Sequence, residues 1–132
     1  MEPIVRAVLD TGVLINAESR SKVAWSIQRK ARGSRALIIT TPVLTQVWRS
    51  GPRQAALCRF LKGCMIDSPS ESVAKRAGEL LGRAGTSDAV DALVVATAIE
   101  MEAATIFTSD PDDLEALLDV SDAPAPPLVQ KV

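Results

Sequence analysis

Residues 86–114, TSDAVDALVVATAIEMEAATIFTSDPDDL, contain the signals of a helix, a strand and a second helix. Asp88 is a favoured helix N-cap residue, and the apolar run that follows predicts a buried helix over residues 89–102. The segment TIFT at 105–108 predicts a short strand, and Asp110 with the proline after it predicts the start of another helix. A helix, a strand and a helix in this order are typical of an α/β domain.

The residues before this stretch continue the alternation of helices and strands. Apolar segments predict strands over 4–9 and 36–39 and a brief one over 64–66. N-cap residues and terminal glycines predict the intervening helices, which cover 22–32, 43–49 after Thr41 and Pro42, 52–62, and Ser68 or Ser70 to about 83. Because helices separate most of the strands, we expect a three-layer α/β sandwich with a central, mostly parallel sheet flanked by helices.

Length and composition suit one folded domain. The chain has 132 residues, and 47% of them are hydrophobic, which is enough for a core without disulfide bonds. Residues 1–120 are expected to form the core and 121–132 a Pro-rich tail, in which 128–132 add an edge strand. Aromatic residues make up only 3%, which argues against a nucleic-acid surface built from stacked aromatic rings.

The sequence contains no histidine, so it excludes Ser-His-Asp and Cys-His catalysis and ribonuclease chemistry that relies on histidine. Cys58 and Cys64 form no metal-binding motif, and we expect both to be reduced thiols in the core. Neither a signal peptide nor a membrane-spanning apolar run is recognisable. These features predict a cytoplasmic protein that has no membrane partner.

Charge is distributed unevenly along the chain. Residues 1–66 contain 11 Lys and Arg against 3 Asp and Glu, whereas residues 67–132 contain 4 against 13. A basic surface beside an acidic one suits a polyanionic substrate held against a metal site. The alternative is that these charges lie on ordinary solvated helix faces.

Three groups of acidic residues stand at the ends of predicted strands or the starts of predicted helices. They are Asp10, the pair Asp88 and Asp91, and the cluster Asp110, Asp112 and Asp113. Each group also has a structural interpretation as a turn or an N-cap, with Asp91 and Asp113 at the third positions of their helices. Carboxylate oxygens without nitrogen or sulfur ligands suit Mg²⁺ or Mn²⁺ and not zinc.

In order and spacing, these acidic groups resemble the pattern of PIN domains. The run DALVVATA at 91–98 and the segment TSD at 108–110, with Leu114 after it, are similar to the VapC toxins of bacterial toxin–antitoxin pairs. The resemblance covers residues 4–118. It implies a PIN-like fold and a metal-dependent endoribonuclease that hydrolyses phosphodiester bonds in tRNA or ribosomal RNA. It also implies a VapB-type antitoxin as partner, and a homodimer.

The resemblance also assigns roles to individual residues. It implies that Asp10, Asp91 and Asp110 hold one Mg²⁺ or Mn²⁺ and that Asp88 is a further ligand or a water-orienting base. Asp112 and Asp113 are predicted as outer ligands, and the hydroxyls of Thr11 and Ser109 as hydrogen-bond donors to a phosphate or a ligand carboxylate. For those two hydroxyls, hydrogen bonding within a local turn remains the alternative.

One position departs from the PIN pattern. PIN domains usually carry an acidic residue on the helix after the second strand, and here Gln46 stands there. An amide oxygen can still ligate, but it adds no negative charge, so a catalytically weakened or inactive PIN fold that only binds RNA or a partner is the alternative. Arg49 and Arg53 follow closely and are predicted to contact RNA phosphates.

Phosphotransfer proteins form a second rival class, since they too place an aspartate after a strand. An aspartate-nucleophile phosphatase needs a second aspartate two residues after the first, where this chain has Gly12. A receiver domain needs a phospho-accepting aspartate after a middle strand, and none is evident. The sequence therefore favours the nuclease.

Overall fold

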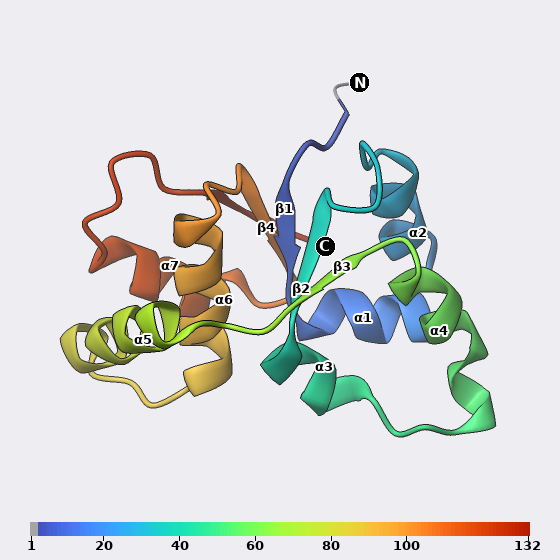
Figure 1. Ribbon diagram of the computed structural model, residues 1–132, viewed down its shortest axis with the longest axis horizontal. Coiled ribbons are helices and arrows are strands. Elements are labelled where there is room, and N and C mark those ends of the chain that lie inside the picture. Colours follow the sequence, from blue (N-terminus) through green and yellow to red (C-terminus); the bar gives the residue numbers. More distant parts are fainter. Residues whose placement is uncertain (1–2) are drawn as a thin grey trace.

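A computed structural model describes residues 3–132 and contains a five-stranded sheet in which all strands are parallel. The strand order is β3-β2-β1-β4-β5 (Figure 1). The strands are β1 (Ala7–Leu9), β2 (Leu37–Thr40), β3 (Met65–Asp67), β4 (Thr105–Thr108) and β5 (Leu128–Lys131). The predicted parallel sheet is confirmed, and the predicted edge strand is β5, which pairs with β4.

Helices cover both faces of the sheet, as predicted. One layer contains α5 (Glu71–Ala84), α6 (Ala89–Glu100) and α7 (Pro111–Asp119), and the other contains α1 (Thr11–Glu18), α2 (Lys22–Arg29) and α4 (Ala55–Leu61) (Figure 1). Helix α3 (Thr41–Val47) begins where β2 ends, and a short 3₁₀ turn, η1 (Pro52–Gln54), precedes α4. The result is a three-layer sandwich.

The central strands and α6 form the core. Every residue of β1 and β2 is buried, because these strands have helices on both faces. Helix α6 packs on β1, β2 and β4 and also contacts α5 and α7, so it is enclosed on most sides. This explains why its sequence is apolar around its whole circumference and does not show one polar face.

Helix α1 was not predicted from the sequence. Its segment TGVLINAE contains a glycine and three β-branched residues, Thr11, Val13 and Ile15, which have low helix propensity. It also lacks a clear polar face, because it lies on the sheet and against α2, α3 and α4. Tertiary packing therefore stabilises this helix more than its own propensity does.

Several predicted boundaries were wrong by a few residues. The strand predicted over 4–9 is confined to Ala7–Leu9, and Ile4 makes an isolated bridge with Ala31 instead. Thr41 was predicted to cap α3, but Thr40 is the N-cap and its hydroxyl accepts a hydrogen bond from the N–H of Val43 at 3.4 Å. Thr40 is thus both the last residue of β2 and the N-cap of α3.

The expectation that both cysteines lie in the core was wrong for Cys58, which is exposed on α4. Cys64 is partly buried, and burial raises the pKa of its thiol to about 12, so it stays protonated. Within residues 3–132, no helix is both long and apolar enough to cross a membrane.

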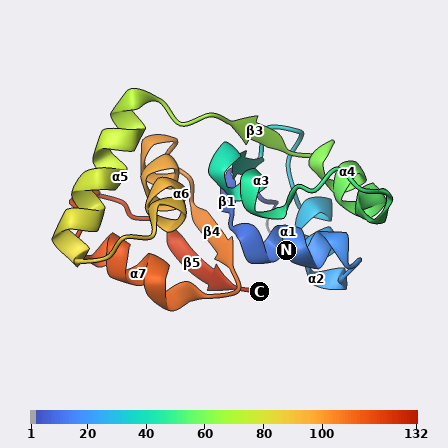
Figure 2. The same cartoon turned by 90° about the horizontal axis from the view of Figure 1, so that it is seen from below.

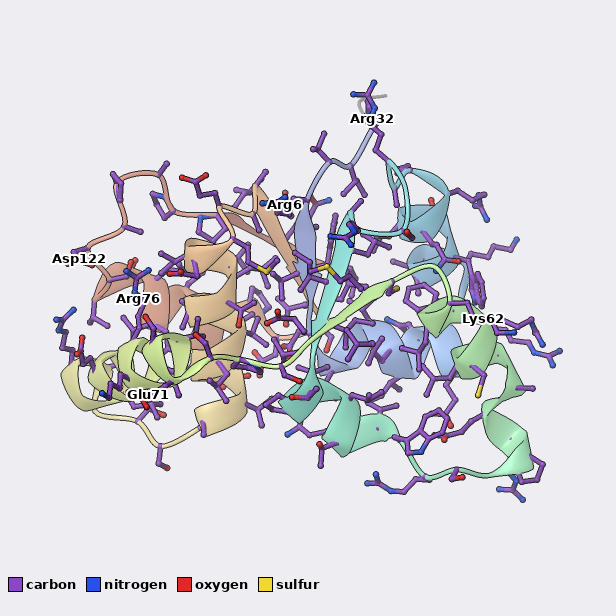
Figure 3. All side chains as sticks on the ribbon, viewed as in Figure 1. Arg6, Arg32, Lys62, Glu71, Arg76 and Asp122 are labelled. Carbon is purple, nitrogen blue, oxygen red and sulfur yellow. The ribbon has the colours of Figure 1, made fainter. Side chains whose placement is uncertain are left out.

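The uneven charge of the sequence becomes a separation in space. The helices of the basic first half, α1, α2 and α4, lie on one side of the sheet, and those of the acidic second half, α5, α6 and α7, lie on the other (Figure 1). Lys62 and Glu71 accordingly point outward from opposite ends of the molecule (Figure 3). A long polyanion therefore meets very different potentials on the two sides.

Candidate active site

The carboxyl edge of the sheet brings together the acidic residues that the sequence singled out. Asp10 directly follows β1, and Asp110 follows β4, the parallel neighbour of β1. The N-terminus of α6, which carries Asp88 and Asp91, points to the same edge, seen from below in Figure 2. In parallel α/β sheets, this edge is where ligands bind.

Asp10 is fixed by two hydrogen bonds and is only 8% exposed. Its Oδ1 accepts from the backbone N–H of Thr11 at 2.8 Å, and its Oδ2 accepts from the hydroxyl of Thr108 at 2.8 Å. The N–H of Asp110 in turn donates to that hydroxyl at 3.0 Å. One hydroxyl therefore joins the ends of β1 and β4, and each oxygen of Asp10 keeps a lone pair for a further ligand.

Asp88 and Asp91 open α6 in the arrangement predicted for an N-cap and a third helical residue. Asp88 Oδ1 accepts from the backbone N–H of Asp91 at 3.1 Å. Asp91 is half-buried, and desolvation together with the charges of Asp88, Asp10 and Asp113 raises its pKa to about 7. Negative charges from three separate elements therefore act on the carboxyl group of Asp91.

The cluster that opens α7 is only partly explained by helix capping. Asp110 occupies the N-cap position, but its side chain accepts no capping hydrogen bond, so its carboxylate is available for another role. Asp112 and Asp113 are exposed in the first turn of α7. Asp113 contributes to the raised pKa of Asp91, whereas Asp110 and Asp112 are not among its causes. The roles predicted for these residues remain predictions.

Gln46, the departure from the expected acid, reaches the edge from α3. Its Oε1 accepts a short hydrogen bond from the hydroxyl of Thr11, the residue after Asp10. Gln46 therefore ties α3 to the start of α1. The hydroxyl of Thr11 is engaged by this contact across the fold and not by the local turn bond considered as its alternative.

Gln46 also lines a groove of about 410 Å³ that contains both predicted phosphate-binding arginines, Arg49 and Arg53. Buried Gln54 shapes this groove: its Oε1 accepts from the N–H groups of Arg49 and Ser50, at 2.9 and 3.1 Å. Its Nε2 donates to Val47 O and Glu18 Oε1, at 2.8 and 3.1 Å. All four hydrogen-bonding positions of this amide are used, so the loop after α3 is held in one conformation.

Two residues that position the site were missed at the level of sequence. Thr108 holds Asp10, and its only sequence signal is a hydroxyl at the last position of a buried strand. Gly12 packs against the loop after β4: a Cβ added there would lie 2.0 Å from Ser109 Oγ and 2.7 Å from Ser109 Cβ. The absence of a side chain at Gly12 lets the start of α1 approach the Asp110 loop.

The donor set fits a hard divalent cation in its chemistry. Carboxylate oxygens of Asp10, Asp88, Asp91 and Asp113 repel one another, as the pKa of Asp91 indicates, and a cation would relieve that repulsion. Within residues 3–132, however, no three acidic or cysteine side chains stand close enough to hold one ion together. Binding would thus require these side chains to move closer, which rotation of an exposed aspartate can accomplish.

The raised pKa of Asp91 predicts how stability depends on pH without metal. The folded protein favours the neutral acid, so folding is penalised as pH rises from the ordinary value of 3.8 to about 7, and the penalty is complete above that. In EDTA at pH 8, Asp91→Asn should raise the free energy of unfolding by about 1–2 kcal/mol, discounted because the group is only half-buried. Urea denaturation measures this gain, which should shrink toward pH 4.

Asp122→Asn is the matched control, since Asp122 is exposed in the tail (Figure 3). It should change stability by less than about 0.5 kcal/mol at either pH. An Asp91→Asn protein that is less stable than the wild type at pH 8 would show that burial and the neighbouring carboxylates do not penalise the charged form of Asp91.

The contact at Gly12 predicts a second effect on stability. Gly12→Ala should destabilise the protein by about 1–3 kcal/mol, because the new methyl group overpacks against Ser109 and its backbone nitrogen, 3.3 Å away. Gly82→Ala is the control, since Gly82 lies on an exposed face of α5 with no neighbouring atom within 4 Å. That substitution should stabilise by about 0.5–1 kcal/mol. Equal melting temperatures of the two variants would show that contact with Ser109 does not exclude a side chain at position 12.

A known protein family matches this chain in sequence, and solved structures resemble it in fold. The sequence profile of the PIN domain matches residues 7–117, from β1 to α7. No curated protein is matched by the sequence. A toxin–antitoxin complex from Klebsiella pneumoniae has a similar structure, with a TM-score of 0.69 and 20% identity over 94% of this chain and 95% of that one.

A second similar structure is that of VapBC2 from Rickettsia felis bound to a DNA fragment from their promoter. Its TM-score is 0.68, with 17% identity over 97% of this chain and 99% of that one. At these identities, both structures show a shared fold. The profile match spans most of the chain and includes Asp10, Asp91 and Asp110, and the chain therefore belongs to the PIN domain family.

Proposed function

We propose that this protein is a Mg²⁺- or Mn²⁺-dependent endoribonuclease that hydrolyses phosphodiester bonds in RNA. One observation carries the proposal: Asp10, Asp91 and Asp110 lie at the same carboxyl edge of the parallel sheet, and Asp10 is held there by hydrogen bonds from Thr11 and Thr108. Such a concentration of negative charge is costly unless a cation joins it. PIN-family membership gives nuclease chemistry as the use for that cation.

The proposed ligands are Asp10, Asp91 and Asp110, with Asp88 as a further ligand or water-orienting base. A bound Mg²⁺ or Mn²⁺ would supply an activated water and neutralise charge on the phosphate. Asp10 is preorganised for its role, because Thr11 and Thr108 fix its carboxylate before any ligand arrives. Asp112 and Asp113 would act as outer ligands, Gln46 would offer an amide oxygen, and Ser109 would donate from its hydroxyl.

RNA would reach these carboxylates along the groove that contains Arg49 and Arg53, which connects to the edge through Gln46. The two guanidinium groups would contact phosphates and give salt-dependent binding. Arg49 also donates from Nη1 to Trp48 O at 2.7 Å and to Thr45 O at 3.3 Å, which orients it at the end of α3. The substrate class we propose is tRNA or ribosomal RNA.

We also propose a toxin role in the cytoplasm, with a VapB-type antitoxin as partner and a homodimer as the assembled form. The two similar structures are a toxin–antitoxin complex and VapBC2, and their chains match this one over nearly their whole length. A polypeptide partner that covers the carboxyl edge would block the approach of RNA.

A catalytically inactive module that binds RNA or a partner is the second candidate. It is favoured by Gln46, which replaces a carboxylate with a neutral amide and is already engaged by Thr11. The absence, among residues 3–132, of three preassembled acidic ligands points in the same direction. Loss of one carboxylate lowers metal affinity. The endoribonuclease and the binding module therefore differ in whether the protein still cleaves RNA.

The proposal predicts that the purified protein cuts total RNA into discrete fragments when Mn²⁺ or Mg²⁺ is added. EDTA should abolish the cleavage, and Asp10→Asn should reduce it by at least about 100-fold, because the substitution removes a charged ligand. The fold should survive, since an asparagine can still accept from the N–H of Thr11 and donate to Thr108.

Asp122→Asn removes the same charge from the exposed tail and should cut RNA at the wild-type rate. Normal cleavage by a correctly folded Asp10→Asn protein would overturn the assignment of the site. RNA binding without cleavage under any metal condition would favour the binding module, and Gln46→Glu would then test whether the missing acid is the cause.

A further inference from the structure

A second groove, of about 350 Å³, lies between α2 and the ends of β4 and β5. Helix α1 separates it from the groove of Arg49 and Arg53: α1 packs against α3 on one side and β4 on the other. Figure 2 shows α3 and the end of β5 on these two sides of α1. The second groove belongs to neither the carboxylate cluster nor the arginine groove.

Three lysines line this groove: Lys22 and Lys30 from the two ends of α2, and Lys131 from β5. No aspartate or glutamate lines it. In the part of the chain that the structure describes, the ion pairs are Lys75–Glu71 and Arg76–Glu100, so none of the three lysines is paired with a carboxylate. Both of those ion pairs lie on the other helical layer, where Figure 3 shows Glu71 and Arg76. The groove thus carries three lysine side chains and no acidic side chain.

This groove adjoins the carboxyl edge of the sheet. Lys131 is the register partner of Thr108, whose hydroxyl holds Asp10. The N–H of the next residue, Val132, donates to Thr108 O at 2.8 Å, which fixes the end of β5 beside β4. One strand therefore separates Lys131 from the aspartate that the proposed reaction needs.

The remaining lining suits a nucleotide strand better than a single inorganic anion. Ile27 and Phe107 form an apolar base, Val23 is 44% exposed, and Ser26 and Gln130 add polar groups. Riboses and bases can pack on such apolar surface while phosphates contact the ammonium groups. An acidic polypeptide is the other ligand that three unpaired lysines would attract.

We propose that the groove of Lys22, Lys30 and Lys131 binds phosphates of the RNA strand on the side of the scissile bond opposite to Arg49 and Arg53. This inference rests on the proposed ribonuclease function. Carboxylates at the edge repel a polyanion, so a strand is held there only if cations on both flanks compensate. RNA is favoured over an acidic polypeptide because Lys131 pairs with Thr108, the residue that holds Asp10 at the edge where the phosphodiester would be cut.

The test measures binding of a fluorescein-labelled oligouridine, about twelve nucleotides long, by fluorescence anisotropy in EDTA, where no cleavage occurs. The triple variant Lys22→Gln, Lys30→Gln, Lys131→Gln is compared with the wild type. We expect its Kd to rise about 10- to 100-fold at about 50 mM salt. The slope of log Kd against log salt concentration should fall by about 2, because each lost phosphate contact contributes about 0.7.

A charge-matched control replaces three basic residues outside both grooves, Arg32, Arg59 and Lys62, with glutamine. Arg32 and Lys62 lie at the margins of the molecule (Figure 3). The control should raise Kd by less than about 3-fold. Unchanged affinity and slope in the lysine variant, or an equal loss in the control, would overturn the inference.

Two other outcomes separate this inference from the function on which it rests. If the wild type fails to bind the oligouridine, both the ribonuclease proposal and this inference fall. If the lysine variant binds RNA normally but loses affinity for a poly-glutamate peptide, the groove recognises an acidic polypeptide, and the ribonuclease proposal stands without it.

Discussion

The hydrogen bond from Thr108 to Asp10 fixes the carboxyl edge of the sheet, where the proposed metal ligands lie. It joins the ends of two adjacent parallel strands and immobilises a carboxylate that is almost fully buried. The same hydroxyl accepts from the N–H of Asp110, so the loop after β4 is positioned by the same contact. Gly12 permits this arrangement, because a side chain there would push that loop away. The positions of Asp10 and Asp110 are therefore coupled and not independent.

Charged residues are arranged around this edge in two ways, locally near Asp91 and across the two sides of the sheet. Locally, burial and then the charges of Asp88, Asp10 and Asp113 raise the pKa of Asp91, and these carboxylates form a negative cluster suited to a cation. Over the whole molecule, the helices of the basic first half of the sequence lie on one side of the sheet and those of the acidic second half on the other. One groove on this side contains two arginines, and a second groove contains three lysines. A polyanion attracted to that side would approach the negative cluster from a favourable potential.

Much of this structure was predictable from residue patterns, for reasons that particular elements make clear. The TIFT strand and the Asp88 cap of α6 were predicted correctly, because apolar runs and cap residues are local signals. Helix α1 was missed, since its apolar and β-branched residues owe their conformation to neighbours distant in sequence. The contacts of Gln46 with Thr11 and of Gly12 with Ser109 also join residues far apart, and no local pattern encodes them. The acidic residues were found because charge at the end of an apolar strand is conspicuous.

We propose that the negative cluster at the carboxyl edge is a site for a divalent cation. Calorimetric titration of Mn²⁺ into the wild type, Asp91→Asn and the exposed control Asp122→Asn tests it most directly. Saturable binding is expected for the wild type and the control, with binding at least about 10-fold weaker for Asp91→Asn. Absence of binding to the wild type, or equal binding by all three proteins, would contradict it.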